Sequence, residues 1–118
     1  MDTIEIRGLQ VATRIGVPAK ERERWQTLEL DLALTPKTAF DKVGDDLSKT
    51  VDYEAVCLKL RDWSETNERH LLESFGEDLT RNLLATFALH EVKLTIRKFI
   101  IPGTDSVGIH LTRRATSA

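Results

Sequence analysis

Apolar and polar residues alternate along four stretches of this chain. The clearest stretch is 28–34, where a leucine occupies every second position. Because successive side chains of a strand point to opposite faces, this pattern predicts a strand with one buried face. The ranges 92–97 and 107–112 alternate in the same way, and 4–15 alternates less regularly on either side of Gly8. We therefore expect four strands, the first of them bent or bulged at the glycine.

Two stretches in the middle of the chain have the three-to-four spacing of amphipathic helices. In the first, apolar residues recur over 53–64, and Asp52 precedes them where an N-cap residue is expected. This helix should end near Asn67. The second helix has its apolar face over 72–87 and should be closed by His90.

The segments that join these elements are rich in turn and loop residues. Gly16 and the charged run 20–24 predict a turn between the first two strands, and 36–48 predicts a connection with one short helical turn at 38–43. The order of the elements is then β-β-α-α-β-β. We expect one domain over residues 1–118, of the α+β class, in which a four-stranded antiparallel sheet carries two helices on one face.

Such a sheet has two edge strands, each with a row of unpaired backbone groups. Edge strands of this length promote aggregation unless another strand pairs with them. We therefore expect subunits of this protein to associate edge to edge and to close into a ring.

The composition excludes several classes of partner. Seventeen basic residues stand against nineteen acidic ones, interspersed along the 118 residues, so no basic stripe predicts nucleic-acid binding. No apolar stretch approaches the ~20 residues that span a bilayer, so no membrane partner is expected. The single cysteine, Cys57, has no intramolecular disulfide partner, and the N-terminal residues lack the features of a signal peptide. A cytoplasmic protein is expected.

Lys98 is the strongest candidate for chemistry, because it ends a predicted strand just before a loop. Strand parity puts it on the buried face with Val92, Leu94 and Ile96, whereas Arg97 falls on the opposite face. A register slip by one residue would reverse this choice. The ordinary alternative is a solvated lysine at the end of a strand.

Three other segments also place a polar residue at the end of an apolar or turn element. They are 16–21, 51–53 and 71–73. Together with Lys98 they predict one assembled site. The histidines at 70 and 110 have no second ligand at helical or strand spacing, so a functional histidine is not expected.

Five short segments occur in order over nearly the whole chain. They are Ile15-Gly16-Val17 followed by Glu21, Thr50-Val51-Asp52-Tyr53, Leu71-Leu72-Glu73, the strand that ends in Lys98, and Val107-Gly108-Ile109 with Arg113. Together they resemble the dihydroneopterin aldolase family and its relative, dihydroneopterin triphosphate epimerase. The resemblance implies the tunnelling ββααββ fold, in which four subunits close an antiparallel barrel and two such rings stack. Whether this chain forms a tetramer or an octamer stays open.

The resemblance also implies how the substrate is bound. Glu73, at the start of the second helix, is expected to bind the ring N–H and the amino group of a pterin, with Leu72 beside it. Val51 is expected to offer backbone groups to the pterin edge. Because family sites lie between neighbouring subunits, Tyr53 should come from one chain, and Glu73 and Lys98 from another.

The implied reaction is the aldol cleavage of 7,8-dihydroneopterin, with some epimerisation at the 2' carbon. Lys98 is expected to act as acid and base through a water, and Tyr53 to donate or relay a proton. Glu21 would hold the hydroxylated side chain of the substrate or a catalytic water, and Glu23 is the alternative at that place. Since the pterin C=N system accepts the electrons, the resemblance implies no cofactor, no metal and no Schiff base.

Two other functions remain open. A triphosphate epimerase would need extra cations near the substrate side chain, for which Lys20, Arg22 and Arg24 are candidates. A catalytically silent binding protein on the same fold is the other. The chain also departs from its relatives after the lysine, since it has Phe99-Ile100-Ile101 where they commonly have a proline.

Overall fold

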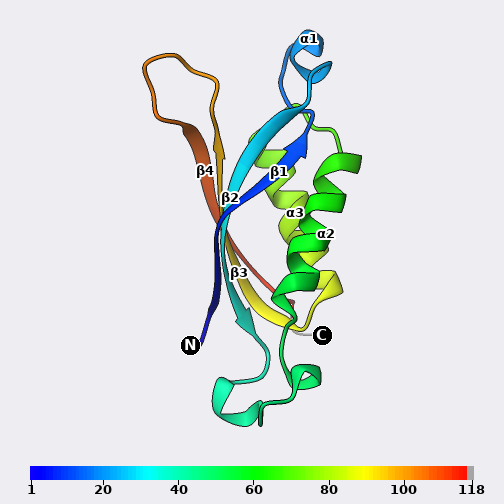
Figure 1. Cartoon of the computed structure of the whole chain (residues 1–118), viewed down its shortest axis with the longest axis vertical. Helices are drawn as coiled ribbons and strands as arrows, with labels where there is room; N and C mark the ends of the chain where they lie inside the picture. Colours follow the sequence, from blue (N-terminus) through cyan, green and yellow to red (C-terminus); the bar gives the residue numbers. More distant parts are fainter. Residues whose placement is uncertain (117–118) are drawn as a thin grey trace.

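The structure is a computed structural model that describes residues 1–116. Its strands and helices follow the chain in this order: β1 (Ile4–Thr13), α1 (Ala19–Arg22), β2 (Gln26–Pro36), the 3-10 turns Phe40–Lys42 and Leu47–Lys49, α2 (Tyr53–Thr66), α3 (Leu72–Thr86), β3 (Leu89–Lys98) and β4 (Val107–Arg114). The four strands form one antiparallel sheet in the order β1-β2-β3-β4. Figure 1 shows α2 and α3 side by side on one face of this sheet. The expected sheet with its two helices is confirmed.

Strand β1 is bulged at the predicted glycine. Its pairing with β2 shifts register between Ile6 and Leu9, and Gly8 has a φ of 68°. This left-handed conformation is one that glycine adopts without steric cost. The Gly8 N–H, which the bulge turns out of the ladder, donates to Asp31 Oδ1 at 2.7 Å.

The two helices begin and end close to the predicted positions, with one correction. Asp52 caps α2 through its Oδ1 atom, which accepts from the backbone N–H groups of residues 54 and 55. Helix α2 ends at Thr66, with Asn67 as its C-cap. The prediction that His90 closes the second helix is wrong, because α3 ends at Thr86 and β3 already begins at Leu89. The backbone of the loop at 87–89 turns sharply instead, through a hydrogen bond from residue 89 to residue 87.

The charged run 20–24 was expected to be a simple turn, and it contains a helix instead. Helix α1 has four residues and no side-chain cap. It lies beyond the end of β1, at the same end of the sheet as the β3–β4 loop (Figure 1). In the 38–43 segment, the expected helical turn is the 3-10 turn Phe40–Lys42.

The hydrophobic core lies between the sheet and the two long helices. Helix α2 packs on β1, and α3 packs on β3 and β4. At Gly76 the helix α3 approaches the sheet closely: a Cβ built there would lie 3.1 Å from Ile109 and 3.3 Å from Ile96. The largest fully buried side chains of this core are Phe75, Ile15, Leu28, Leu30, Leu34, Leu60, Leu79, Leu83, Leu89, Leu94, Ile96 and Val11.

The face of the sheet without helices is charged, and Arg97, near the end of β3, is paired with two carboxylates there. Its guanidinium binds Glu29 Oε1 and Asp31 Oδ2, each at 2.6 Å. The hydrogen bond from Arg97, supported by the one from the Gly8 N–H, holds the pKa of the Asp31 carboxyl below its ordinary value. Three strands are thus joined by ion pairs and hydrogen bonds on the side away from the core.

We expect the contribution of Asp31 to stability to disappear in acid. A carboxyl whose pKa is lowered by folding stabilises the protein above its unfolded value, here 3.8, and this contribution is lost as the pH falls through the folded pKa. Asp31→Asn should therefore lower the urea midpoint at pH 7, and the difference from the parent protein should shrink towards pH 3. The matched control is Asp105→Asn, at an exposed aspartate of the β3–β4 loop. If Asp31→Asn lowered the urea midpoint by the same amount at both pH values, this account would be contradicted.

Candidate active site

Lys98 is the last residue of β3, and its side chain lies on the face of the sheet that the helices cover. Its backbone pairs with Leu28 of β2 and Val107 of β4. Only 12% of the Lys98 side chain is exposed. Arg97 lies on the opposite face and is bound to two carboxylates. The parity argument is confirmed, and Lys98 is the residue that points towards a pocket.

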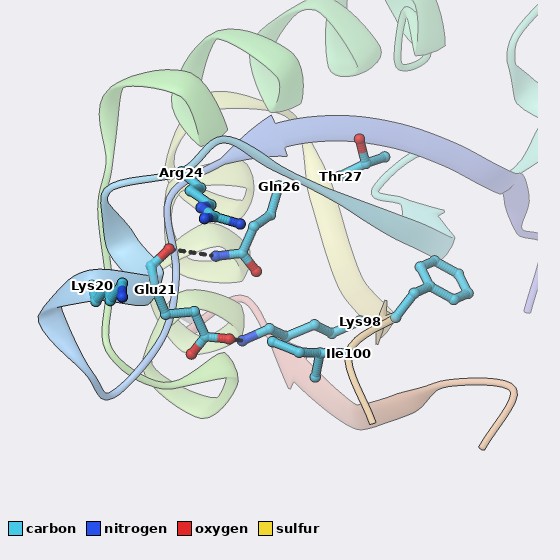
Figure 2. Close-up of a pocket in the computed structure, with 8 residues that line it drawn as sticks. Lys20, Glu21, Arg24, Gln26, Thr27, Lys98 and Ile100 are labelled. Atoms are coloured by element: carbon cyan, nitrogen blue, oxygen red, sulfur yellow. Dashed lines mark hydrogen bonds and ion pairs between the residues drawn. The ribbon is translucent and has the colours of Figure 1, made fainter. Parts of the chain in front are cut away.

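The Lys98 ammonium is paired with Glu21 of α1. The distance from Lys98 Nζ to Glu21 Oε2 is 3.0 Å, and 22% of the Glu21 side chain is exposed. Gln26 holds the backbone of this region, since its Nε2 donates to the carbonyl oxygens of Ile15 at 2.5 Å and of Glu21 at 3.2 Å. Figure 2 shows the Glu21 carboxyl group directed at the lysine. Glu23, the alternative at this place, is exposed and does not line the pocket.

The ion pair lines a pocket of about 630 Å³. This volume lies within the range of small-molecule sites. The pocket is bounded by Lys20, Glu21, Arg24, Gln26, Thr27, Lys98, Phe99 and Ile100 (Figure 2). Phe99 and Ile100 belong to the segment that departs from the family pattern, and they give the pocket an apolar wall beside its charged groups.

Sequence reasoning missed Gln26 and Thr27 as site residues. They begin β2, and β2 pairs with β3 so that Leu28 lies opposite Lys98. The signal that would have found them is the strand pairing itself. Once the lysine is placed at the end of β3, the first residues of its neighbour β2 must lie beside it.

Arg22 is not available to a ligand in this pocket. Its Nη1 donates to the carbonyl oxygens of Gly16 and Val17, both at 2.8 Å, and its Nε pairs with Glu68 at 3.0 Å. Of the three cations considered for a phosphorylated substrate, only Lys20 and Arg24 line the pocket.

Glu73 lies at the same end of the sheet as Lys98 without lining the pocket. It is the second residue of α3 and is exposed, and Leu72 before it is half-buried. Gly76, one turn further on, packs against Ile96, which is two residues from the lysine. The described residues show no ion pair or side-chain hydrogen bond to the Glu73 carboxylate, which stands at the positive end of a 15-residue helix.

Tyr53 and Val51 lie at the other end of the molecule. The C-terminal end of α2 is near the pocket, because Thr13 Oγ1 donates to the Asn67 carbonyl and Thr13 pairs with Gln26. Tyr53 is at the N-terminal end of the same 14-residue helix, about 20 Å away at 1.5 Å per residue. Tyr53 is 63% exposed, and Val51 is buried in the core. One chain therefore brings together Glu21 and Lys98, and it does not bring Tyr53 or Val51 to them.

Neither a metal cluster nor a membrane span occurs in the part of the chain that the structure describes. No group of three or more His, Cys, Asp or Glu side chains is arranged to hold an ion within residues 1–116. None of the helices described there has both the length and the apolar character needed to cross a bilayer. His110 Nδ1 lies 2.9 Å from Thr95 Oγ1 on the face of the sheet without helices.

The chain is similar to known proteins over almost its entire length. The family model of dihydroneopterin aldolase (FolB) matches residues 4–112. A dihydroneopterin aldolase of Streptomyces coelicolor is 32% identical over 116 residues, which cover 96% of this chain and 98% of the relative.

Solved structures have the same fold. FolB of Vibrio cholerae superposes with a TM-score of 0.89 at 27% identity, over 97% of this chain and 98% of its own. Dihydroneopterin aldolase of Escherichia coli, solved in complex with neopterin, has a TM-score of 0.87 at 25% identity, over 96% of this chain and 99% of its own.

Proposed function

The chain belongs to the dihydroneopterin aldolase family, and on that premise we propose that its Lys98–Glu21 pocket cleaves 7,8-dihydroneopterin. The products are 6-hydroxymethyl-7,8-dihydropterin and glycolaldehyde, a step towards folate. The observation that carries this proposal is the ion pair of 3.0 Å between a largely buried lysine and a carboxylate at the wall of a pocket of about 630 Å³. A relative of the same fold is known in complex with neopterin.

The reaction requires proton transfers at two positions of the substrate side chain. Loss of the 2'-hydroxyl proton lets the C1'–C2' bond break, so that C2' becomes the aldehyde carbon and the electron pair enters the pterin C=N system. C1' then takes up a proton. Lys98 acts as acid and base through a water, and Glu21 holds that water or the hydroxylated side chain, since the two groups are 3.0 Å apart. Return of glycolaldehyde before release produces some 2'-epimer.

Glu73 is the proposed anchor for the pterin ring. A carboxylate accepts two parallel hydrogen bonds from adjacent donors, which the ring N–H and the amino group of a pterin supply. Glu73 is exposed at the N-terminus of α3, at the Lys98 end of the sheet. Leu72 packs beside the ring in this arrangement.

The remaining proposed site residues come from a neighbouring subunit. Tyr53 is exposed at the far end of α2, where it is free to contact a second chain. The sheet supports this arrangement, because β1 and β4 form its edges with ten and eight residues. Pairing of β1 with β4 of the next chain satisfies both edges and closes a ring. The charged face with Arg97 then lines the inside of the ring, and the helices lie outside.

The pocket gives less support to triphosphate epimerase activity than to aldolase activity. A triphosphate carries several negative charges, and Arg22, one of its three candidate cations, is occupied by two carbonyl groups and Glu68. Lys20 and Arg24 alone remain beside the ion pair.

The function is tested by incubating the purified protein with 7,8-dihydroneopterin or with its triphosphate, in a buffer that contains a metal chelator. Chromatography of the products should show 6-hydroxymethyl-7,8-dihydropterin from the unphosphorylated compound. Isomerisation of the triphosphate without cleavage would establish the epimerase instead. An absence of change in both compounds, with binding of neopterin retained, would identify a silent binding protein.

A further inference from the structure

The Glu21 carboxyl group lies directly against the backbone of Gly16. A Cβ atom built on Gly16 would overlap Oε1, Cδ and Cγ of Glu21. Gly16 follows Ile15 in the segment between β1 and α1, and its φ of 152° is one that residues with side chains rarely adopt. The space that the glutamate occupies therefore exists only because residue 16 has no side chain.

The backbone at Gly16 is held by hydrogen bonds on both sides, which oppose its movement away from a larger neighbour. Its N–H donates to the Arg69 carbonyl at 3.3 Å, next to the bridge that pairs Ile15 with Arg69. Its carbonyl accepts from Arg22 at 2.8 Å, and 17% of the Arg22 side chain is exposed. If a methyl group were added at residue 16, the flexible end of Glu21 would be the part that has to move.

Movement of Glu21 would separate it from Lys98. The carboxyl group uses Oε2 to contact the lysine and packs its other oxygen against Gly16. We propose that Gly16 is a positioning residue. Because it has no side chain, the Glu21 carboxylate has room to lie where it reaches Lys98 Nζ. In this role Gly16 touches no substrate and acts through Glu21. The functional part of this inference rests on the proposed aldolase activity.

A competing explanation is that glycine is required at residue 16 only by its backbone conformation. The two explanations differ in whether Glu21 matters. If the backbone alone is responsible, a substitution at residue 16 has the same effect whether or not the glutamate is present. If Gly16 acts through Glu21, the effect disappears when the glutamate is truncated.

The test is Gly16→Ala, made in the parent protein and in a Glu21→Ala background. In the parent we expect kcat to fall about 100-fold, the size of effect that a displacement of about 1 Å has on a catalytic group. In the Glu21→Ala background, where the overlapping atoms are gone, the further loss should be less than about twofold, by the non-additivity expected of contacting residues. Equal losses in the two backgrounds would overturn the proposal.

Gly44→Ala is a control for the general effect of replacing a glycine of positive φ by alanine. Gly44 has a φ of 60° in the connection before α2, and no atom lies within 4 Å of a Cβ built there. It should lower thermal stability with kcat unchanged. A 100-fold loss of kcat in this variant too would show that the effect at Gly16 is not specific to its contact with Glu21.

A crystal structure of the Gly16→Ala protein gives a result that does not depend on activity. We expect the Glu21 carboxyl group to have rotated away from Lys98, and an intact 3.0 Å contact would refute the inference even if the protein is an aldolase. Conversely, a displaced carboxylate in a protein that does not cleave 7,8-dihydroneopterin would leave the positioning role standing and remove the proposed function. Should Gly16→Ala fail to fold, rescue of folding by Glu21→Ala is expected, and failure of that rescue would also overturn the proposal.

Discussion

Replacement of Lys98 by alanine should strongly lower turnover while the protein still folds and binds a pterin. General acid–base catalysis by one positioned side chain contributes about 10²- to 10⁴-fold, so kcat should fall by that factor. Binding of neopterin, measured by calorimetry, should change far less, because the pterin ring is assigned to Glu73. A fall in affinity with unchanged kcat would show that Lys98 binds the substrate and takes no part in proton transfer.

Two controls separate the loss of the ammonium group from other effects of the substitution. Lys98→Met keeps most of the aliphatic stem of a side chain that is only 12% exposed, so it should be as inactive as Lys98→Ala with less loss of packing. Lys93→Ala removes an exposed lysine from the opposite face of the same strand and should leave kcat unchanged.

Mixing two inactive variants should restore activity. In a ring whose sites combine Lys98 of one subunit with Tyr53 of the next, Tyr53→Ala and Lys98→Ala chains each lack a different half of the site. Refolding an equal mixture of the two should yield about a quarter of the parental specific activity, since a quarter of the random interfaces contain both intact residues. The exposure of Tyr53 makes its substitution mild for the fold.

The measurement compares this mixture with each variant refolded alone. Activity that stays at the average of the two variants would show that the residues do not meet across an interface. As a further control, Tyr53→Ala refolded with the double variant Tyr53→Ala/Lys98→Ala should gain nothing, since no subunit then supplies the phenol.

Local patterns in the sequence were sufficient to predict the sheet and the long helices. The leucine alternation of β2, the glycine at the bulge of β1 and the aspartate that caps α2 are each decided by residues within a few positions of one another. The same local rule placed Lys98 on the covered face of β3, because strand parity needs only a correct register.

The parts that sequence reasoning missed depend on contacts between distant segments. Helix α1 has four residues and no cap of its own, and Arg22 and Gln26 hold it through bonds to the preceding loop. A run of charged residues contains no periodicity from which such a helix is predicted. Sequence reasoning expected Glu21 and Lys98 in one site, but their direct contact, which joins α1 to the end of β3, is defined only by the assembled sheet.

The expectation of one site from four segments illustrates the same limit. The segments 51–53 and 71–73 do lie at the starts of α2 and α3, but the pattern did not indicate at which end of the molecule each segment lies. The length of α2 determines where Tyr53 lies, because Tyr53 is at the N-terminal end of this helix and the pocket is near its C-terminal end. Within one chain only the segments that contain Glu21 and Lys98 come into contact among the described residues. The roles given to Tyr53, Val51 and Glu73 stay predictions.

In the proposed ring, the separation of Tyr53 from Lys98 along α2 would make the specific activity depend on the protein concentration. A single chain would then carry the two halves of a site at opposite ends and would be inactive when alone, whatever the amount of substrate. Specific activity should therefore fall on dilution below the dissociation constant of the assembly, and substrate bound across the interface should oppose that fall by favouring the associated state. A cell that makes little of this protein would then have disproportionately less of its activity.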